Sequence, residues 1–162
     1  MREETKRKAV LYAISVGIPL AVGGLSALLT AKNMDIYSEL KTPPGSPPSV
    51  MFPIVWTVLY ILMGISAALV RQNCRMDKNS ADAGLAFYAL SLAFNFVWSI
   101  LFFNMRAFVF SFVWLCGLLL LIALTIIKYK NVSKKAAYLQ IPYLIWVIYA
   151  GYLNLGISIL NK

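Results

Sequence analysis

The sequence predicts an all-α integral membrane protein, a single domain over residues 1–162 in which five transmembrane helices form a bundle. Of the 162 residues, 60% are hydrophobic, whereas a soluble domain is nearer half apolar. The apolar residues gather in five blocks of about 20 residues, the length that crosses the hydrocarbon core of a bilayer. None of these blocks contains Asp, Glu, Lys or Arg. The blocks are residues 10–30, 50–70, 83–103, 107–127 and 136–160.

The first block follows basic residues and so has some likeness to a signal peptide. Its apolar run is longer than the hydrophobic region of a signal peptide, and no small-residue cleavage site clearly closes it. We therefore expect residues 10–30 to be retained as the first helix.

The connection between the first two blocks, residues 31–49, is the longest in the chain. Loops of this length in a compact protein are usually functional or disordered. This one has prolines at positions 43, 44, 47 and 48, which fix the backbone and restrict the residues before them. Tyr37 and Leu40 supply apolar anchors. We expect the loop to fold over the helix ends as a lid; a stiff spacer is the alternative.

The remaining connections are short. About three residues around Arg106 join the third and fourth blocks, so these helices should form a tight antiparallel hairpin. Polar connectors join the other blocks, and the chain shows no convincing internal repeat. Five helices also leave no simple pair of inverted halves, which many secondary transporters have.

The net charge of +9 does not indicate a nucleic-acid partner, because the charges follow the membrane topology. Alternate segments carry eleven and four Lys and Arg residues, and the side with the excess is normally cytoplasmic. We expect the N-terminus and residues 71–82 and 128–135 in the cytoplasm, and residues 31–49, the Arg106 turn and the C-terminus outside. This topology describes a multi-pass protein of a bacterial plasma membrane.

Few residues are suited to conventional catalysis. Cys74 lies in a connector and Cys116 inside the fourth block, so we expect no disulfide. The chain has no histidine, which removes the commonest general base and the usual haem ligand. No pair of carboxylates lies within the blocks. We therefore expect no metal site.

The four tryptophans lie deeper in the predicted spans than the interfacial belts where tryptophan usually gathers. At about 1.5 Å per helical residue, each falls within about 7 Å of the midpoint of its span, while the interface lies about 15 Å away. They are Trp56, Trp98, Trp114 and Trp146. A buried indole needs a partner for its N–H, so this depth indicates either core packing or a ligand cavity.

Three tryptophans share a helix face with polar or small residues three or four positions away. These sets are Trp56 with Tyr60, Asn95 with Trp98, and Trp146 with Ala150 and Asn154. An amide in hydrocarbon should point into the bundle and find a partner. Together the three sets would form an aromatic pocket with few hydrogen-bonding groups. Spacing leaves open the alternative that Asn95 only joins two helices.

A resemblance to a known family rests on three stretches, SPPSVMFPIVWTVLYILMGIS, AFNFVWSILFF and IPYLIWVIYAGYLN. They resemble signature segments of the TspO family of tryptophan-rich sensory proteins and translocator proteins, also called peripheral benzodiazepine receptors. The resemblance runs from Val10 to the C-terminus. It implies a homodimer of five-helix bundles with a cavity beneath the first loop. The implied ligands are porphyrins such as protoporphyrin IX, haem, sterols, and synthetic benzodiazepine-type or isoquinoline compounds.

The resemblance also implies roles for particular residues. The two tryptophans that family members use in light- and oxygen-dependent porphyrin breakdown match Trp56 and Trp146. The full set of implied ligand-binding residues is Tyr37, Pro47, Pro48, Trp56, Tyr60, Asn95, Trp98, Trp146 and Ala150. No tightly bound cofactor is implied, and porphyrin or haem would be the ligand.

Some positions depart from the family pattern. Gly45 stands two residues before the proline pair, where members often carry an aromatic residue, and Val50 stands two after it, where many carry tryptophan. The loop should therefore stack less tightly on a porphyrin. Tyr149 and Tyr152 have no Lys or Arg nearby, so we predict no sterol site.

Three functions remain after these observations. The first, which we favour, is a membrane receptor or sensor that binds porphyrins in a pocket under the first loop. The second is a membrane protein that degrades porphyrin with light and oxygen through Trp56 and Trp146, and the third is a tetrapyrrole or sterol transporter. The expected partners are porphyrin-like small molecules, the lipid bilayer and a second copy of the chain, with no nucleic acid.

Overall fold

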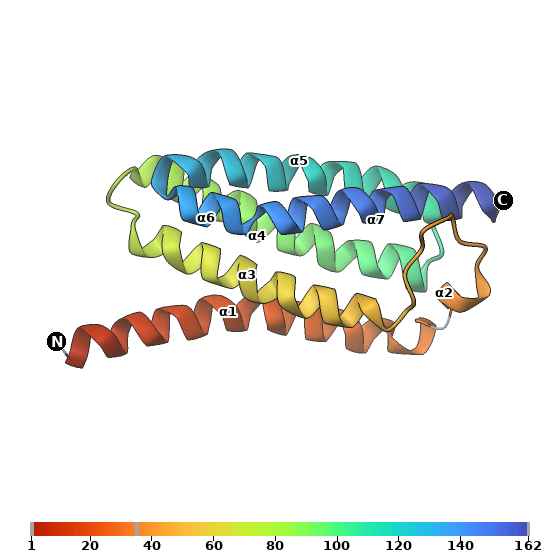
Figure 1. Cartoon of the computed structure of the whole chain (residues 1–162), viewed down its shortest axis with the longest axis horizontal. Helices are drawn as coiled ribbons and strands as arrows, with labels where there is room; N and C mark the ends of the chain where they lie inside the picture. The colour runs from red at the N-terminus through yellow and green to blue at the C-terminus, as the bar shows by residue number, and fades with distance from the viewer. Residues whose placement is uncertain (1, 35, 162) are drawn as a thin grey trace.

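The structure, a computed structural model, describes residues 2–34 and 36–161. Within these residues the chain forms seven α-helices and two short helical turns, and no β-strand. The helices are α1 (Arg2–Thr30), α2 (Ile36–Glu39), α3 (Met51–Gln72), α4 (Lys78–Ser99), α5 (Phe108–Val132), α6 (Lys134–Leu139) and α7 (Ile141–Leu160). The turns are a 3-10 turn, η1 (Ala31–Asn33), and a π-helical turn, η2 (Ile100–Asn104). The long helices lie side by side (Figure 1).

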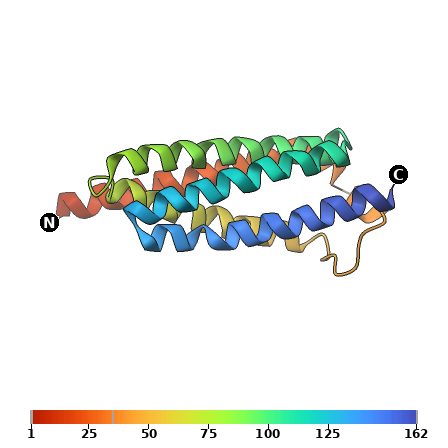
Figure 2. The same cartoon turned by 90° about the horizontal axis from the view of Figure 1, so that it is seen from above.

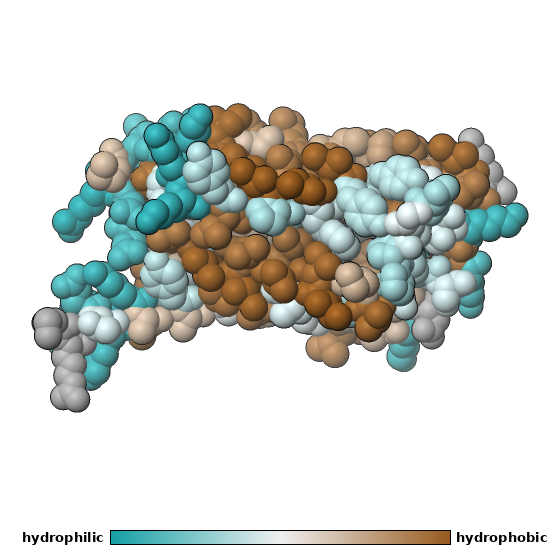
Figure 3. Space-filling model, in the orientation of Figure 1, coloured by the Kyte–Doolittle hydropathy of each residue, from teal (hydrophilic) through white to brown (hydrophobic). Residues whose placement is uncertain are grey.

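Five membrane-spanning segments are present, as the sequence predicts. By length and composition, five stretches of the described residues are apolar enough to cross a bilayer. They are Glu3–Asn33, Met51–Gln72, Lys78–Asn104, Phe108–Val132 and Lys134–Leu160. The surface agrees, because a broad hydrophobic band covers the middle of the molecule and hydrophilic residues gather most densely near the N-terminus (Figure 3). The predicted all-α membrane bundle is therefore confirmed.

The two ends of the bundle differ in composition. One end holds the N-terminus and the connections after α3 and after α5, and we call it the basic end because most Lys and Arg residues lie there. The other holds residues 31–50, the turn between α4 and α5, and the C-terminus, and we call it the loop end. A view from above shows the same separation (Figure 2).

Polar residues start or extend helices at the basic end. Lys8 forms an ion pair with Glu4, one turn earlier, at 2.9 Å, and α1 continues past its apolar block as far as Arg2. Asp77 caps α4 by accepting a hydrogen bond from the backbone N–H of Ser80 at 2.9 Å. This hydrogen bond lowers the pKa of Asp77, as expected for a carboxylate that caps a helix N-terminus.

Helices α4 and α5 form the antiparallel hairpin that the sequence predicts. They are joined by residues 105–107, and Arg106 has a positive φ of 52°. Such a conformation is uncommon for a residue other than glycine. It reverses the chain within three residues, so the two helices pack against each other along their length.

The fifth span is not the single helix that its unbroken apolar block predicts. It is divided into α6 and α7 at Gln140. Pro142 lacks the N–H that would continue the hydrogen-bond ladder of α6, so α7 begins anew. The buried side chain of Gln140 donates to Ser66 Oγ at 3.3 Å, and Ser66 donates to the carbonyl of Ala136 at 2.8 Å. The break thus becomes a polar joint between α3 and the α6–α7 junction.

Helices α1 and α3 approach closely at two glycines. A Cβ atom on Gly64 would collide with the backbone of Ser15 and Val16, and a Cβ on Gly23 would collide with the ring of Tyr60. Small residues allow this kind of backbone approach in membrane proteins. This contact closes the space between α1 and α3 toward the basic end. The main cavity of the molecule begins on the side toward the loop end.

The long loop packs against α7. The Tyr149 and Tyr152 hydroxyls donate to the carbonyls of Gly45 and Pro44, at 2.6 and 2.9 Å. The Asn161 side chain pairs with both backbone groups of Lys41, at 3.0 and 2.8 Å. These hydrogen bonds hold the middle of the loop beside the loop-end half of α7.

Gly45 explains one departure from the family pattern. Its φ is +79°, in the left-handed region that glycine adopts without steric cost. An aromatic residue with this backbone conformation would be strained. The loop therefore turns at a glycine and offers its carbonyl to Tyr149.

Candidate ligand-binding cavity

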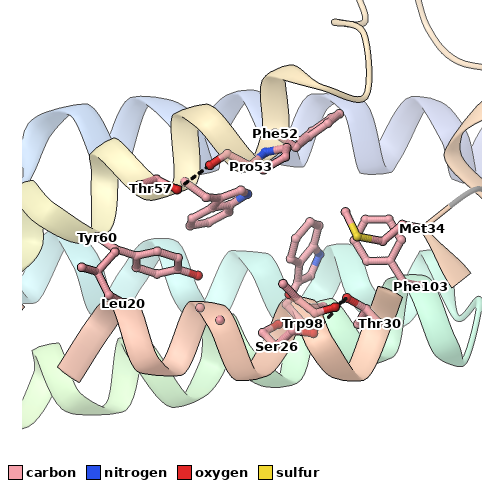
Figure 4. A pocket seen from close by; sticks show the side chains of 15 residues that line it. Leu20, Ser26, Thr30, Met34, Phe52, Pro53, Thr57, Tyr60, Trp98 and Phe103 are labelled. Carbon is pink, nitrogen blue, oxygen red and sulfur yellow. Dashed lines mark hydrogen bonds between the residues drawn. The ribbon is translucent and has the colours of Figure 1, made fainter. Parts of the chain in front are cut away.

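The main cavity has a volume of about 240 Å³ and lies between α1, α3 and the end of α4. Its described lining is uncharged and combines aromatic rings, small residues and hydroxyl groups. The lining residues are Leu20, Gly23, Gly24, Ser26, Ala27, Thr30, Met34, Phe52, Pro53, Trp56, Thr57, Tyr60, Trp98, Ser99 and Phe103. Figure 4 shows that Phe52, Pro53 and Thr57 face it from α3, whereas Ser26 and Thr30 face it from α1.

Aromatic rings form the walls of the cavity. The rings of Trp56 and Tyr60, one turn apart on α3, are stacked with centroids 5.5 Å apart and planes at 28°. Trp98 faces the cavity from α4. Its N–H donates to Asn154 Oδ1 at 3.2 Å, and Asn154 donates to the carbonyl of Phe108 at 2.8 Å. The orientation of the Trp98 ring is therefore fixed by α7 and α5.

Most hydroxyl groups of the cavity bond to their own helix. Thr30 donates to the carbonyl of Ser26 at 2.9 Å, Thr57 to Pro53 at 2.7 Å, and Ser99 to Asn95 at 3.4 Å. Side chains bonded in this way satisfy their donors locally. They leave a largely apolar surface to a ligand.

Three donors remain for a ligand. One is the Ser26 hydroxyl, which makes no hydrogen bond among the described residues. The Tyr60 oxygen accepts a hydrogen bond from Asn95 Nδ2 at 2.8 Å, so its own proton is free to donate to another group. Figure 4 shows this hydroxyl pointing into the space between α1 and α3. Among the described residues, the indole N–H of Trp56 makes no hydrogen bond either. The cavity thus offers apolar faces and three donors, without a charged group among its described lining residues.

The cavity opens toward the lipid-facing side of the bundle. Gly24 and Ala27 on α1, and Pro53 and Thr57 on α3, line the cavity and are also exposed. These four residues belong to two of the membrane-spanning segments. A ligand dissolved in the bilayer can therefore meet the cavity from the side.

The structure brings three of the sequence-predicted site residues into the cavity wall: Trp56, Tyr60 and Trp98. Trp146 lies one layer behind, edge-on to Trp56 with centroids 6.5 Å apart and planes at 89°. Its Nε1 is buried and has no partner among the described residues. Trp146 therefore contacts the wall of the cavity without lining it.

Other predicted residues also lie outside the main cavity. Asn95, 2% exposed, holds Tyr60 from behind, so it joins two helices and positions a wall residue at once. Tyr37 and Ala150 line a small neighbouring cavity of about 20 Å³. Pro47 lies in the loop, where its carbonyl accepts a hydrogen bond from Tyr37 at 3.2 Å. Burial raises the pKa of Tyr37. Pro48 follows in the loop and lines none of the cavities described here.

Sequence reasoning missed the contribution of α1. Gly23, Gly24, Ala27 and Thr30 supply one whole side of the cavity. The small residues at positions 23 and 27 were the available signal, but the same spacing serves helix packing equally well. Phe52 and Phe103, at the loop end of the cavity, were also not predicted.

Trp114 belongs to a different environment. Its ring stacks on Phe94 with centroids 4.3 Å apart and planes at 17°. Its N–H donates to the carbonyl of Phe94 at 2.8 Å. No described residue of α5 lines the main cavity.

The fold and the cavity together define a class of protein: a multi-pass helical membrane protein with an uncharged, aromatic-walled cavity between its helices. Comparison with known proteins agrees and is more specific. The chain matches the TspO/MBR family over residues 15–160. It belongs to this family.

Relatives at similar identity come from distant organisms. The chain is 36% identical to the tryptophan-rich protein TspO of Chlorobaculum tepidum. The 156 aligned residues cover 96% of this chain and 98% of that protein. It is 38% identical to the protein CrtK of Rhodobacter capsulatus, over 77% of this chain and 78% of that protein. It is 35% identical to the translocator protein of Ovis aries, over 73% of this chain and 70% of that protein.

Proposed function

We propose that this protein is a membrane receptor or sensor that binds porphyrins, such as protoporphyrin IX and haem, in the cavity between α1, α3 and α4. The observation that carries the proposal is the wall formed by the stacked Trp56 and Tyr60 on one side and Trp98 on the other. Aromatic faces suit a flat, apolar ring system. A few hydrogen-bond donors in an apolar site are typical of ligand pockets.

Haem would be held here without a histidine ligand, because the chain contains none. Among the described lining residues, Met34 and Tyr60 have side chains of types that ligate haem iron in other proteins. Binding through the ring faces would therefore matter more than iron ligation. Metal-free protoporphyrin IX and haem should accordingly bind with similar affinity.

Three further features belong to the same proposal. The loop end faces outside and the basic end faces the cytoplasm, as the distribution of Lys and Arg favours. The loop acts as a lid, a role that its hydrogen bonds to Tyr149, Tyr152 and Asn161 support. The protein works as a homodimer, as the resemblance to its family implies.

The experiment that tests this function is a titration of the purified protein with protoporphyrin IX in the dark, followed by visible absorption and tryptophan fluorescence. We expect saturable binding to the wild type and at least several-fold weaker binding to Trp56→Ala and Asn95→Ala. An aromatic contact contributes about 0.5–1.5 kcal/mol beyond its buried area, and about 1.4 kcal/mol is a tenfold change in affinity.

Trp114→Phe is the matched control, because it changes a tryptophan that packs outside the cavity. It should bind like the wild type. Equal weakening by Trp114→Phe and Trp56→Ala, with the fold intact, would place the binding site elsewhere.

A second candidate function, light- and oxygen-dependent porphyrin breakdown, is favoured by one observation. Trp146, whose N–H is buried without a partner among the described residues, contacts Trp56 edge-on. The two indoles implied by the resemblance thus lie together, one at the cavity and one behind it. Illumination of bound and free protoporphyrin IX at equal absorbance distinguishes the functions, since a protein that only binds should not change the products.

A further inference from the structure

Two more cavities adjoin the main one at the loop end. The larger has a volume of about 220 Å³ and is lined by Met34, Tyr37, Ser38, Ser49, Val50, Phe52 and Phe103. We call it the outer cavity. The smaller, about 20 Å³, lies toward α7. Phe52 and Phe103 are the two described residues that line all three cavities, so their rings form the partition between the spaces.

The size of the cavities indicates that a large ligand needs more than one of them. Sites for drug-sized ligands typically measure about 300–1,000 Å³. The main cavity and the outer cavity each fall below this range, but joined they reach it. A tetrapyrrole macrocycle is larger than a drug-sized isoquinoline and would extend from the main cavity to the partition.

The partition can move without a change in the backbone. Phe52 and Phe103 are both partly exposed. Each makes two edge-on contacts, with centroids 5.0–6.3 Å apart. Phe52 contacts Tyr37 and Trp146, and Phe103 contacts Phe102 and Trp98. Rotation of a partly exposed side chain is fast compared with binding. The two rings can therefore turn aside for a ligand.

The main and outer cavities differ in what they offer to a charged group. The described residues of the main cavity include no cation, and an unpaired carboxylate is very costly to bury. The outer cavity also has no cation among its described lining residues, but most of that lining lies beyond the membrane-spanning segments, and Ser49 in it is exposed. Ser49 also precedes the first turn of α3, where the helix dipole favours negative charge. A carboxylate would therefore be far better accommodated in the outer cavity.

We propose that the outer cavity is a second subsite, which receives the carboxylate-bearing edge of a tetrapyrrole whose ring lies in the main cavity. Phe52 and Phe103 set the ligand size, because a ligand that displaces their rings occupies both cavities and a smaller ligand leaves them in place. This inference rests on the proposed porphyrin binding. It adds the orientation of the ligand and the residues that distinguish large from small ligands.

The first test fills the outer cavity. Val50 is 63% exposed and lines the outer cavity but not the main one. Val50→Met should occupy the space without disturbing the core, and it adds no ring that could stack on a porphyrin. We expect at least about fivefold weaker binding of protoporphyrin IX and unchanged binding of an isoquinoline carboxamide. Val113→Met, at a 60% exposed position of α5 that lines none of the three cavities, is the matched control and should change neither.

The second test changes charge at the proposed carboxylate position. Ser49→Asp should weaken protoporphyrin IX at least several-fold, and Ser49→Lys should strengthen it. The dimethyl ester of protoporphyrin IX, which has no carboxylate, should bind all three proteins alike. Thr42→Asp, in the same loop but lining none of the cavities, is the control for a general effect of charge.

The outcomes separate the inference from the function on which it rests. Absence of protoporphyrin IX binding to the wild type overturns both. If the wild type binds both ligands but Val50→Met leaves their affinity ratio unchanged, the outer cavity is not a subsite and porphyrin binding stands. Equal effects of Ser49→Asp on the acid and the ester would likewise overturn the proposed orientation.

Discussion

The two halves of the bundle use aromatic residues in opposite ways. In the loop-end half, Trp56 and Trp98 line a cavity. In the basic half, Tyr88, Tyr129 and Tyr143 are buried, each at most 5% exposed, and fill the space between helices. Aromatic rings therefore line a cavity in one half and fill a solid core in the other, depending on how closely the neighbouring helices approach.

Glycines account for much of this difference. Gly64 lets the backbones of α1 and α3 meet, and Gly84 lets Tyr129 pack against α4, since a Cβ there would lie 2.8 Å from the Tyr129 ring. In the loop-end half, Gly24 has open space around it and lines the cavity. Gly64 and Gly84 thus close the basic half by admitting neighbours, whereas Gly24 leaves the cavity open.

The largest effect should follow from breaking the close contact in the basic half. Gly64→Leu would force its side chain into the backbone of α1, and overpacking in a tight core commonly costs about 1–3 kcal/mol or more. We expect a marked loss of thermal stability in detergent, measured by circular dichroism. Gly17→Leu, on the same pair of helices but with nothing within 4 Å of its Cβ, should unfold like the wild type.

Loss of a tyrosine hydroxyl should lower stability in the loop-end half and not in the basic half. Tyr60→Phe leaves the buried Nδ2 of Asn95 without its acceptor, which costs about 1–3 kcal/mol. The Tyr129 hydroxyl has no partner among the described residues, so Tyr129→Phe should be neutral or slightly stabilising. Equal destabilisation by the two changes, in parallel thermal melts, would show that the two halves are not organised differently.

A smaller effect should follow from releasing the loop. Tyr149→Phe and Tyr152→Phe each remove one hydrogen bond to a loop carbonyl, and such bonds contribute about 0.5–1.5 kcal/mol. We expect faster hydrogen exchange in residues 36–50 and unchanged exchange in α4 and α5. Tyr138→Phe, at an exposed position near the basic end, should leave loop exchange unaltered.

Trp146→Phe should have the smallest effect on porphyrin binding but a clear effect on light-driven porphyrin breakdown. Phenylalanine keeps an aromatic ring behind Trp56 and removes an N–H that has no described partner, so affinity for protoporphyrin IX should stay within about twofold. If the protein degrades porphyrin, light-driven loss of the porphyrin absorption band should slow. An unchanged rate would count against a role for Trp146, and Trp114→Phe serves as the control.

Hydropathy predicted the membrane bundle because span length and the exclusion of charge are set by the bilayer itself. The short turn at Arg106 likewise predicted the hairpin. The break at Gln140 was not predicted, because an apolar block reads the same whether or not its helix is continuous. Pro142 was the signal, yet prolines are tolerated in membrane helices when other groups satisfy the backbone.

Helix spacing predicted part of the cavity and could not predict the rest. Residues one turn apart share a face, which correctly grouped Trp56 with Tyr60. Spacing does not tell how each helix is rotated, so it could not distinguish Trp98, in the wall, from Trp146, one layer behind. The hydrogen bonds of Tyr149 and Tyr152 were equally hidden, because their acceptors are backbone carbonyls that any residue could supply.

The pairing of Asn161 with Lys41 has a practical consequence for handling the protein. One side-chain amide accepts from the backbone N–H of Lys41 and donates to its carbonyl, which ties the last turn of α7 to a loop 120 positions earlier in the chain. A purification tag or fluorescent fusion placed at the C-terminus would pull directly on this loop. The same fusion at the N-terminus would be attached at the opposite end of the bundle, away from the loop.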